Sequence, residues 1–367
     1  MPTEIISKYA ELLVRYCLDV QPGDKVMVSS TILGEPLIRE VYREALRAGA
    51  AIVETELAFR GKELLFLENA SDEALKTLPP GYKNAVETFD CHLTIRAPYN
   101  LRELQNAPGD RSKLRGEAMT PVSKTWSERT AKRALRRNLC QFPTDASAQE
   151  AGMSLEEYEK FVFGACKLFE PDPRSAWLEV RKNQQQIVDL LNRATKIRYR
   201  SPLFDISFGT KGRIWMNSDG QTNMPSGEVY TSPVEDSVEG VVHFTHPCIY
   251  QGNEVEGVTL TVKNGLIEHW EARRGQDFLD QIFSIEGTRR FGEAAIGTNY
   301  GIDRLTKNIL FDEKMGGTIH MAVGQSYLQT GGKNQSQVHW DMITDMTDGG
   351  EVFADGELIY RNGQFLA

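Results

Sequence analysis

The sequence contains few cysteines and no apolar run long enough to cross a membrane. Its five cysteines are an odd number, are widely scattered and include no Cys-x-x-Cys pair, which argues against a disulfide scaffold and a thiolate zinc site. No hydrophobic stretch approaches the roughly 18 residues that a membrane helix needs. The opening residues MPTEIISKYAELL include Glu4 and Glu11 and show no basic segment before an apolar one, so they do not indicate a signal peptide. We therefore expect a cytoplasmic protein that does not associate with membranes.

Basic residues are also fewer than acidic residues. The 42 Lys and Arg residues are outnumbered by 51 Asp and Glu residues, which gives a net charge of −9, and such a field repels polyanions. The one basic run, from Lys124 to Arg137, has helical spacing and is interpreted as an amphipathic helix with a solvated basic face. Nucleic acid is therefore not an expected partner.

The length of 367 residues indicates about two domains. In the first half, apolar stripes with helical periodicity alternate with short β-rich runs, which predicts an α/β domain with a mostly parallel sheet, assigned to residues 1–198. No Gly-x-Gly-x-x-Gly follows the first predicted strand, so a nucleotide site is not indicated. The predicted strands are Lys25–Ser30, Ala51–Glu56 and Cys91–Ile95, and the predicted helices include 5–17, 37–46 and 177–191.

The pattern changes near residue 200 to short strands separated by Gly, Asn and Asp turns. Asn264-Gly265 predicts a type I′ hairpin turn, and Asp355-Gly356 predicts another. Residues 199–367 are therefore assigned to a β-rich α+β domain, which is also the half that holds the candidate chemistry. Its predicted strands include 203–208, 213–216, 241–244 and 258–262.

Two of the six histidines lie in one short glycine-rich stretch with an aspartate. His339 and Asp341 have i, i+2 spacing, which on a strand points both side chains to one face. Nitrogen and carboxylate ligands together suit zinc, cobalt, manganese or iron. His320 ends an apolar run after a double-glycine turn. The alternatives are a structural hydrogen-bonded pair for His339 and Asp341, and a core histidine for His320.

Two glutamates lie beside glycines in otherwise uncharged stretches. Glu228 ends Met-Pro-Ser-Gly-Glu, and Glu293 is followed by Ala-Ala-Ile. A carboxylate buried among apolar residues needs a partner or a cation. Glu293 is therefore a candidate metal ligand, and the alternative for both glutamates is a surface position on a helix or turn.

Four ordered motifs together resemble a known family. NMPSGEVYTSPVEDSVEG, RRFGEAAIGTNYGID, LFDEKMGGTIHMAVGQSY and VHWDM closely resemble the aminopeptidase T and aminopeptidase S family of thermophilic metallopeptidases, and the resemblance extends more weakly through the first half. It implies that a pair of divalent metals is bound by Glu228, Glu293, His320, His339 and Asp341, and that Tyr327 is the family's functional tyrosine.

The resemblance also implies the activity and the assembly. We expect an α/β N-terminal domain, a β-rich catalytic domain and a homodimer that encloses the active sites. The expected reaction is metal-dependent removal of N-terminal residues from short peptides with a free N-terminus, by a hydroxide activated by two ions of zinc, cobalt, manganese or magnesium. Glu293 is the expected proton shuttle, with a role as metal ligand only as the alternative. Tyr327 is the expected donor to the oxyanion, and its alternative is a packed core tyrosine. Candidates to receive the substrate ammonium are Glu235, Asp236 and Glu239, which are equally well explained as a solvated loop face.

Two other functions remain open from the sequence. The 2,5-dihydroxypyridine dioxygenases are a related branch that keeps a His-x-Asp and opens an aromatic ring with one iron. That branch lacks the full set of two glutamates and an extra histidine, which this sequence has at Glu228, Glu293 and His320. The other alternative is a non-enzymatic dimeric scaffold with structural metals, although structural zinc sites are normally closed by Cys and His.

Overall fold

The computed structural model describes residues 3–366 and divides the chain into two compact units. The N-terminal unit reaches Arg174 and also contains Gly220–Pro225, and the C-terminal unit contains Ser175–Asp219 and the chain from Ser226 onward. The predicted boundary between residues 198 and 199 placed helix α9 (Pro173–Leu191) in the first domain, whereas most of this helix is in the second unit. Its residues Val188 and Leu191 belong to the core of that unit, and helical periodicity alone does not show which core a helix joins.

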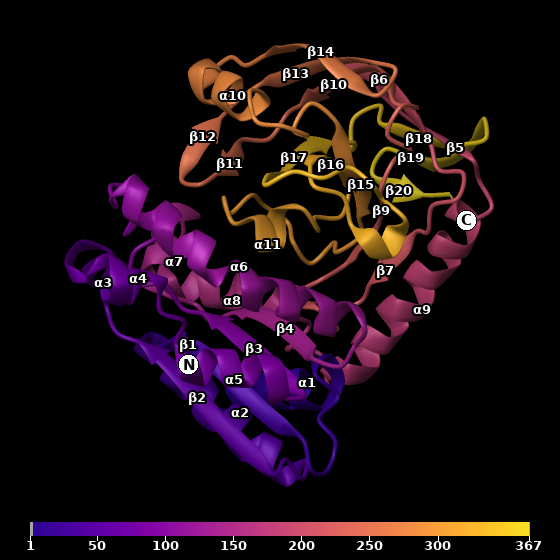
Figure 1. Ribbon diagram of the computed structural model, residues 1–367. Helices are drawn as coiled ribbons and strands as arrows, with labels where there is room; N and C mark the ends of the chain where they lie inside the picture. The colour runs from indigo at the N-terminus through magenta and orange to yellow at the C-terminus, as the bar shows by residue number, and fades with distance from the viewer. Residues whose placement is uncertain (1–2, 367) are drawn as a thin grey trace. The chain divides into compact units, whose positions relative to one another are not determined.

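The N-terminal unit is built on a five-stranded parallel sheet in the order β2-β1-β3-β4-β8. This confirms the predicted α/β class with a parallel sheet, and the three predicted strands form β1 to β3 (Figure 1). Its strands are β1 (Lys25–Thr31), β2 (Ile52–Ala58), β3 (Cys91–Arg96), β4 (Arg136–Gln141) and β8 (Asn223–Met224).

Eight α-helices belong to the described part of this unit. Met27 of β1 belongs to a small buried cluster with Ala85 and Phe89. Ala85 lies in the last turn of α5, and Phe89 directly follows this helix. The basic run is helical only in its first part: α6 ends at Ala131, Arg133 takes a positive φ, and Arg136 begins strand β4. The single-helix interpretation of 124–137 was therefore wrong. The helices are α1 (Thr3–Leu12), α2 (Glu35–Arg47), α3 (Lys62–Asn69), α4 (Asp72–Lys76), α5 (Pro80–Thr88), α6 (Gly109–Ala131), α7 (Asp145–Glu150) and α8 (Leu155–Ala165).

The C-terminal unit is β-rich, as predicted. An eight-stranded sheet has the order β14-β13-β10-β6-β5-β18-β19-β20, and its strand pairs are antiparallel. The predicted hairpin turns at Asn264-Gly265 and Asp355-Gly356 are confirmed, because all four residues have positive φ. The strands are β5 (Lys196–Ser201), β6 (Phe204–Gly209), β10 (Glu239–Phe244), β13 (Val258–Lys263), β14 (Leu266–Glu271), β18 (Glu351–Ala354), β19 (Glu357–Arg361) and β20 (Gln364–Phe365).

A second antiparallel sheet of this unit has the order β17-β16-β15-β9-β7 (Figure 1). Its strands are β7 (Met216–Ser218), β9 (Glu228–Thr231), β15 (Phe291–Gly297), β16 (Thr318–Gly324) and β17 (His339–Asp345). The unit also contains a small sheet of β11 (Cys248–Tyr250) and β12 (Asn253–Val255). Besides most of α9, its α-helices are α10 (Gln276–Phe283) and α11 (Ile309–Asp312). Among residues 3–366, none of the helices has the length and hydrophobicity needed to cross a bilayer.

Candidate metal centre

The predicted metal ligands come from four neighbouring strands of the five-stranded sheet. Because β9, β15, β16 and β17 are adjacent in that sheet, residues about 100 positions apart in the chain become neighbours. The structure brings all five predicted ligands together: Glu228 on β9, Glu293 on β15, His320 on β16, and His339 and Asp341 on β17.

The register of the strands places these side chains on one face. Glu293 pairs with Ala322, and Ala322 pairs with Asp341, so the two carboxylates lie in one cross-strand row and share a face. His320 precedes Ala322 by two residues, and His339 precedes Asp341 by two. Because side chains alternate along a strand, both histidines point to that same face. The methyl side chain of Ala322 leaves the middle of the row open.

Glu228 joins the same face from the first position of β9. It pairs with Gly297, which follows Glu293 by four residues, so the even spacing keeps both glutamates on one side. The intervening residues point to the other face, where they form part of a buried apolar core that fixes the strands: Val229, Ala294, Ile296, Met321, Val323, Trp340 and Met342.

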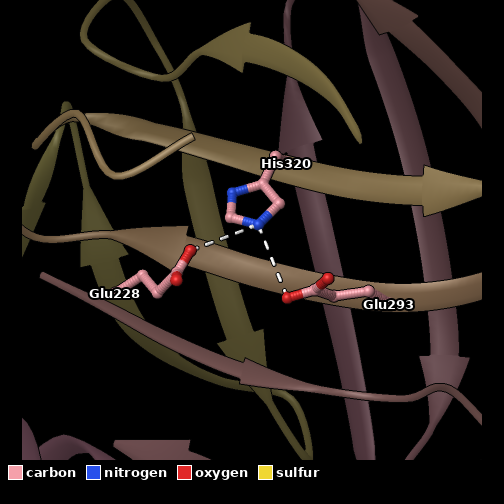
Figure 2. Close-up of side chains that lie close together, drawn as sticks. All are labelled: Glu228, Glu293 and His320. Carbon is pink, nitrogen blue, oxygen red and sulfur yellow. Dashed lines mark ion pairs between the residues drawn. The ribbon is translucent and has the colours of Figure 1, made fainter. Parts of the chain in front are cut away.

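The side chains form two groups that share one carboxylate. In the first group, His320 Nε2 lies 3.4 Å from Glu228 Oε2 and 3.6 Å from Glu293 Oε1. Figure 2 shows the His320 ring between these two carboxylates. In the second group, His339 Nε2 lies 3.1 Å from Glu293 Oε2 and 3.5 Å from Asp341 Oδ1. Glu293 therefore uses one oxygen in each group, which is the arrangement of a bridging ligand.

Two contacts orient the exposed end of this cluster. His339 donates from Nδ1 to the carbonyl oxygen of Gln325 at 2.8 Å, which leaves Nε2 directed at the carboxylates. The Tyr327 hydroxyl lies 3.3 Å from His339 Nε2, and the Tyr327 ring packs edge-on against Tyr230 at 5.4 Å. Tyr327, to which the family resemblance assigns a functional role, thus lies beside the second group.

The electrostatics of the cluster follow from burial and mutual contact. Burial opposes protonation of His320, but the adjacent Glu293 and Glu228 outweigh it and raise its pKa to about 9. Burial alone would raise the pKa of Asp341, but His339 lowers it to about 2. For Glu228, burial dominates over the attraction of Lys314 and His320 and raises the pKa. Opposite charges are therefore packed closely at a site that is largely closed to water.

The donor atoms fit divalent cations. Among the described residues, Glu228 Oε2 and Asp341 Oδ1 are buried oxygens that accept no hydrogen bond, although buried polar atoms normally have a partner. Each belongs to a group of three carboxylate and imidazole atoms within 4.8 Å of one another. Carboxylate oxygen and imidazole nitrogen are the ligands of zinc and other first-row metals in catalytic sites. A cation in each group would satisfy both oxygens.

Sequence reasoning missed one charged pair beside the cluster. Lys314 is completely buried, and its Nζ lies 3.6 Å from Glu228 Oε1 while donating to Glu313. Burial raises the pKa of Glu313, and the adjacent Lys314 ammonium opposes this shift. The sequence feature that could have indicated this pair is the Asp-Glu-Lys run shortly before the double glycine of the third motif. Such charged runs usually lie on solvated surfaces, so the run did not predict burial.

The acidic loop after Glu228 has other partners. Glu235 accepts hydrogen bonds from Arg213 at 2.5 Å and from the Lys333 amide at 2.7 Å. Glu239 accepts from the Asn264 amide at 2.5 Å, next to the hairpin turn. These contacts give both carboxylates a structural role and argue against their receiving a substrate ammonium.

Comparison with known proteins identifies the chain's relatives. A family model described as thermophilic metalloprotease (M29) matches residues 3–365. Aminopeptidase 2 of Geobacillus stearothermophilus is 28% identical over 98% of this chain and 97% of its own length. Aminopeptidase PepS of Streptococcus thermophilus is 27% identical over 99% of this chain and 98% of its own. The resemblance inferred from the four motifs is thereby confirmed.

A solved structure supports the same architecture. Wild-type AmpT from Thermus thermophilus has a TM-score of 0.85 with this chain and covers 99% of both chains at 23% sequence identity. At that identity the likeness concerns the fold. It confirms the predicted combination of an α/β unit with a β-rich unit.

Proposed function

The chain belongs to the thermophilic metalloprotease (M29) family, and from this premise we propose that it is a metal-dependent aminopeptidase that removes N-terminal residues from short peptides. The observation that carries the proposal is the shared carboxylate, because Glu293 directs one oxygen to each of two ligand groups. The names of the relatives, which are aminopeptidases, support the exopeptidase part of the proposal.

We assign one divalent cation to each group. Glu228, Glu293 and His320 would hold one, and Glu293, His339 and Asp341 the other. Two such cations supply Lewis acidity that lowers the pKa of an attacking water and polarises the scissile carbonyl. Zinc, cobalt, manganese and magnesium are the candidates, and the imidazole ligands favour the first three over magnesium.

The protein's own groups then move protons and stabilise charge. Glu293 reaches both groups, so its carboxylate is proposed to accept the proton of the attacking water and to pass it to the leaving amine. The Tyr327 hydroxyl is proposed to donate to the oxyanion of the tetrahedral intermediate. Burial, followed by the nearby Glu293 and Asp341, raises the pKa of Tyr327 well above its usual value, so the hydroxyl keeps its proton at neutral pH.

The open ligand groups suit a substrate with a free amino group. Each group offers three protein ligands, so a bound cation would keep a position for the nitrogen of a neutral α-amino group, which an acetylated N-terminus does not offer. A homodimer with an enclosed active site and a cytoplasmic location stay predictions of the sequence. Light scattering should give about twice the chain mass of 41.3 kDa if the dimer forms.

Two assays test the proposal. Protein treated with EDTA and dialysed should lose peptidase activity and regain it with zinc, cobalt or manganese, and a short peptide should be trimmed faster than its N-acetylated form. The control is His339→Ala purified in the same way, because any activity that survives in it comes from a contaminating peptidase. Full activity without metal would contradict the metal assignment, and equal cleavage of the free and acetylated peptides would contradict the exopeptidase assignment.

The two alternatives are less well supported. A ring-opening dioxygenase needs one iron, whereas these five residues form two ligand groups joined by Glu293. A structural metal site is normally closed by four protein ligands, whereas each group here offers three.

A further inference from the structure

Lys314 is a buried cation at the edge of the ligand cluster. It follows helix α11 and precedes the double-glycine turn that leads into β16, the strand of His320. Its side chain is 0% exposed. Its backbone is fixed at both ends, because its amide donates to the Phe311 carbonyl at 2.9 Å and its carbonyl accepts from the Asn299 amide at 3.0 Å.

The ammonium of Lys314 is held by two carboxylates. Nζ lies 3.6 Å from Glu228 Oε1 and donates to Glu313. A buried ammonium is strongly unfavourable unless its neighbours compensate its charge. Glu228 and Glu313 both lie within ion-pair distance of Nζ and supply that compensation, so the side chain can be held here as a cation.

The two oxygens of the Glu228 carboxylate face different partners. Oε1 faces the ammonium, whereas Oε2 faces His320 Nε2 at 3.4 Å and accepts no hydrogen bond. The carboxylate is thereby held with one oxygen directed toward the first ligand group. Four buried or largely buried carboxylates lie in and beside the cluster: Glu228, Glu293, Glu313 and Asp341. Lys314 lies within ion-pair distance of two of them, Glu228 and Glu313.

We propose that Lys314 is a positioning residue that acts as a resident counter-cation: it compensates the carboxylates and orients Glu228 before metal binds, so that the site folds in the metal-free protein. The inference rests on the metal binding proposed above. Because breaking a buried ion pair leaves an uncompensated charge, loss of Lys314 destabilises the metal-free protein most. A bound divalent cation supplies positive charge in its place, so the metal-loaded protein is affected less.

The test compares thermal unfolding of wild type and Lys314→Met in EDTA and in excess Co²⁺, followed by near-UV circular dichroism. Methionine has a similar length and no charge. We expect the Tm of the metal-free variant to fall by about 10 °C, with less than half of that fall in Co²⁺. A lysine that served only as a structural ion pair would give equal losses in both conditions.

Two further variants sharpen the test. Lys314→Met combined with Glu313→Gln removes one charge of each sign, and we expect the metal-free Tm to recover most of the loss. Lys307→Met, which breaks a more exposed pair with Glu254 at 2.8 Å in the same unit, should change the Tm little and equally in both conditions.

The outcomes separate this inference from the proposed function. If wild type gains no stability from Co²⁺, the proposed metal binding fails. If wild type gains stability but Lys314→Met loses equally with and without metal, does not fold in excess Co²⁺, or is not rescued by Glu313→Gln, the counter-cation role of Lys314 is overturned.

Discussion

Replacement of Glu293 by glutamine tests the geometry of the centre most directly. Its two oxygens lie 3.6 Å from His320 Nε2 and 3.1 Å from His339 Nε2, so a single substitution removes a charged ligand from both groups. Glu228 and Asp341 each belong to one group only. Glu293→Gln should therefore impair both metal sites, whereas Glu228→Gln and Asp341→Asn should each impair one.

The size of the effect can be estimated from charge and distance. Two unit charges about 4 Å apart interact by about 4 kcal/mol at an effective dielectric constant of 20, which is close to a thousandfold in affinity. Loss of an outer partner of a ligand already lowers metal affinity by about 10- to 100-fold. We therefore expect a loss of about 100- to 1000-fold at each group that contains the substituted residue.

The assay is metal content after dialysis against a buffered concentration of free zinc, measured by elemental analysis. We expect two ions per chain in wild type, one in Glu228→Gln and in Asp341→Asn, and fewer than one in Glu293→Gln. Glu268→Gln, at an exposed position on β14, is the matched control and should keep the wild-type content. The reasoning is refuted if Glu293→Gln retains one tightly bound ion, because that residue would then serve a single site.

Three other predictions concern Tyr327, His92 and the hairpin glycines. Tyr327→Phe should lower kcat by about 10- to 1000-fold with unchanged metal content, because it removes only the hydroxyl near His339; an unchanged kcat would make Tyr327 a packing residue. Burial, with a smaller contribution from Arg137, lowers the pKa of His92 from 6.5 to about 4, so the unfolded chain binds a proton in this range that the folded protein excludes. Stability should therefore fall by about 2 kcal/mol between pH 7 and 5, and urea titrations should show a smaller fall for His92→Asn. Gly265→Ala places its Cβ 1.8 Å from the Glu235 carbonyl oxygen at a φ of +71°, whereas Gly356→Ala at +90° meets no atom within 4 Å. Urea unfolding should show the first to be more destabilising by at least about 2 kcal/mol, and equal losses would contradict the clash.

The limits of sequence reasoning are clearest at charged segments. The run from Lys124 to Arg137 has helical spacing throughout, but the chain leaves the helix after Ala131 and enters β4 at Arg136. Arg137 then lies with its guanidinium 4.9 Å from the centroid of the Trp126 ring. Strand pairing with β3 overrides the local pattern there, and such pairing depends on residues distant in the chain.

Lys314 illustrates the same limit within the metal centre. In the sequence it is one member of a charged run, and such runs usually face water. Its burial is decided by the path of the chain from α11 to β16 and by the positions of Glu228 and Glu313. No local pattern distinguishes a buried lysine that has two carboxylate partners from a solvated one.

Patterns in the sequence were enough to predict the fold class and the family. Alternating helical and strand periodicities predicted the parallel sheet, Asn-Gly and Asp-Gly placed two hairpin turns, and four ordered motifs indicated the metallopeptidase family. These features are local, because backbone preference and side-chain periodicity act over a few residues.

The division of the five ligands into two groups, and the sharing of Glu293 between them, became visible from the folded arrangement of the strands. Cross-strand register aligns Glu293 with Asp341 through Ala322, and the adjacent strands bring Glu228 and His320 to the same face. Register depends on the simultaneous packing of four strands on an apolar core. The spacing of the five ligands along the chain does not show which oxygen of Glu293 faces which histidine.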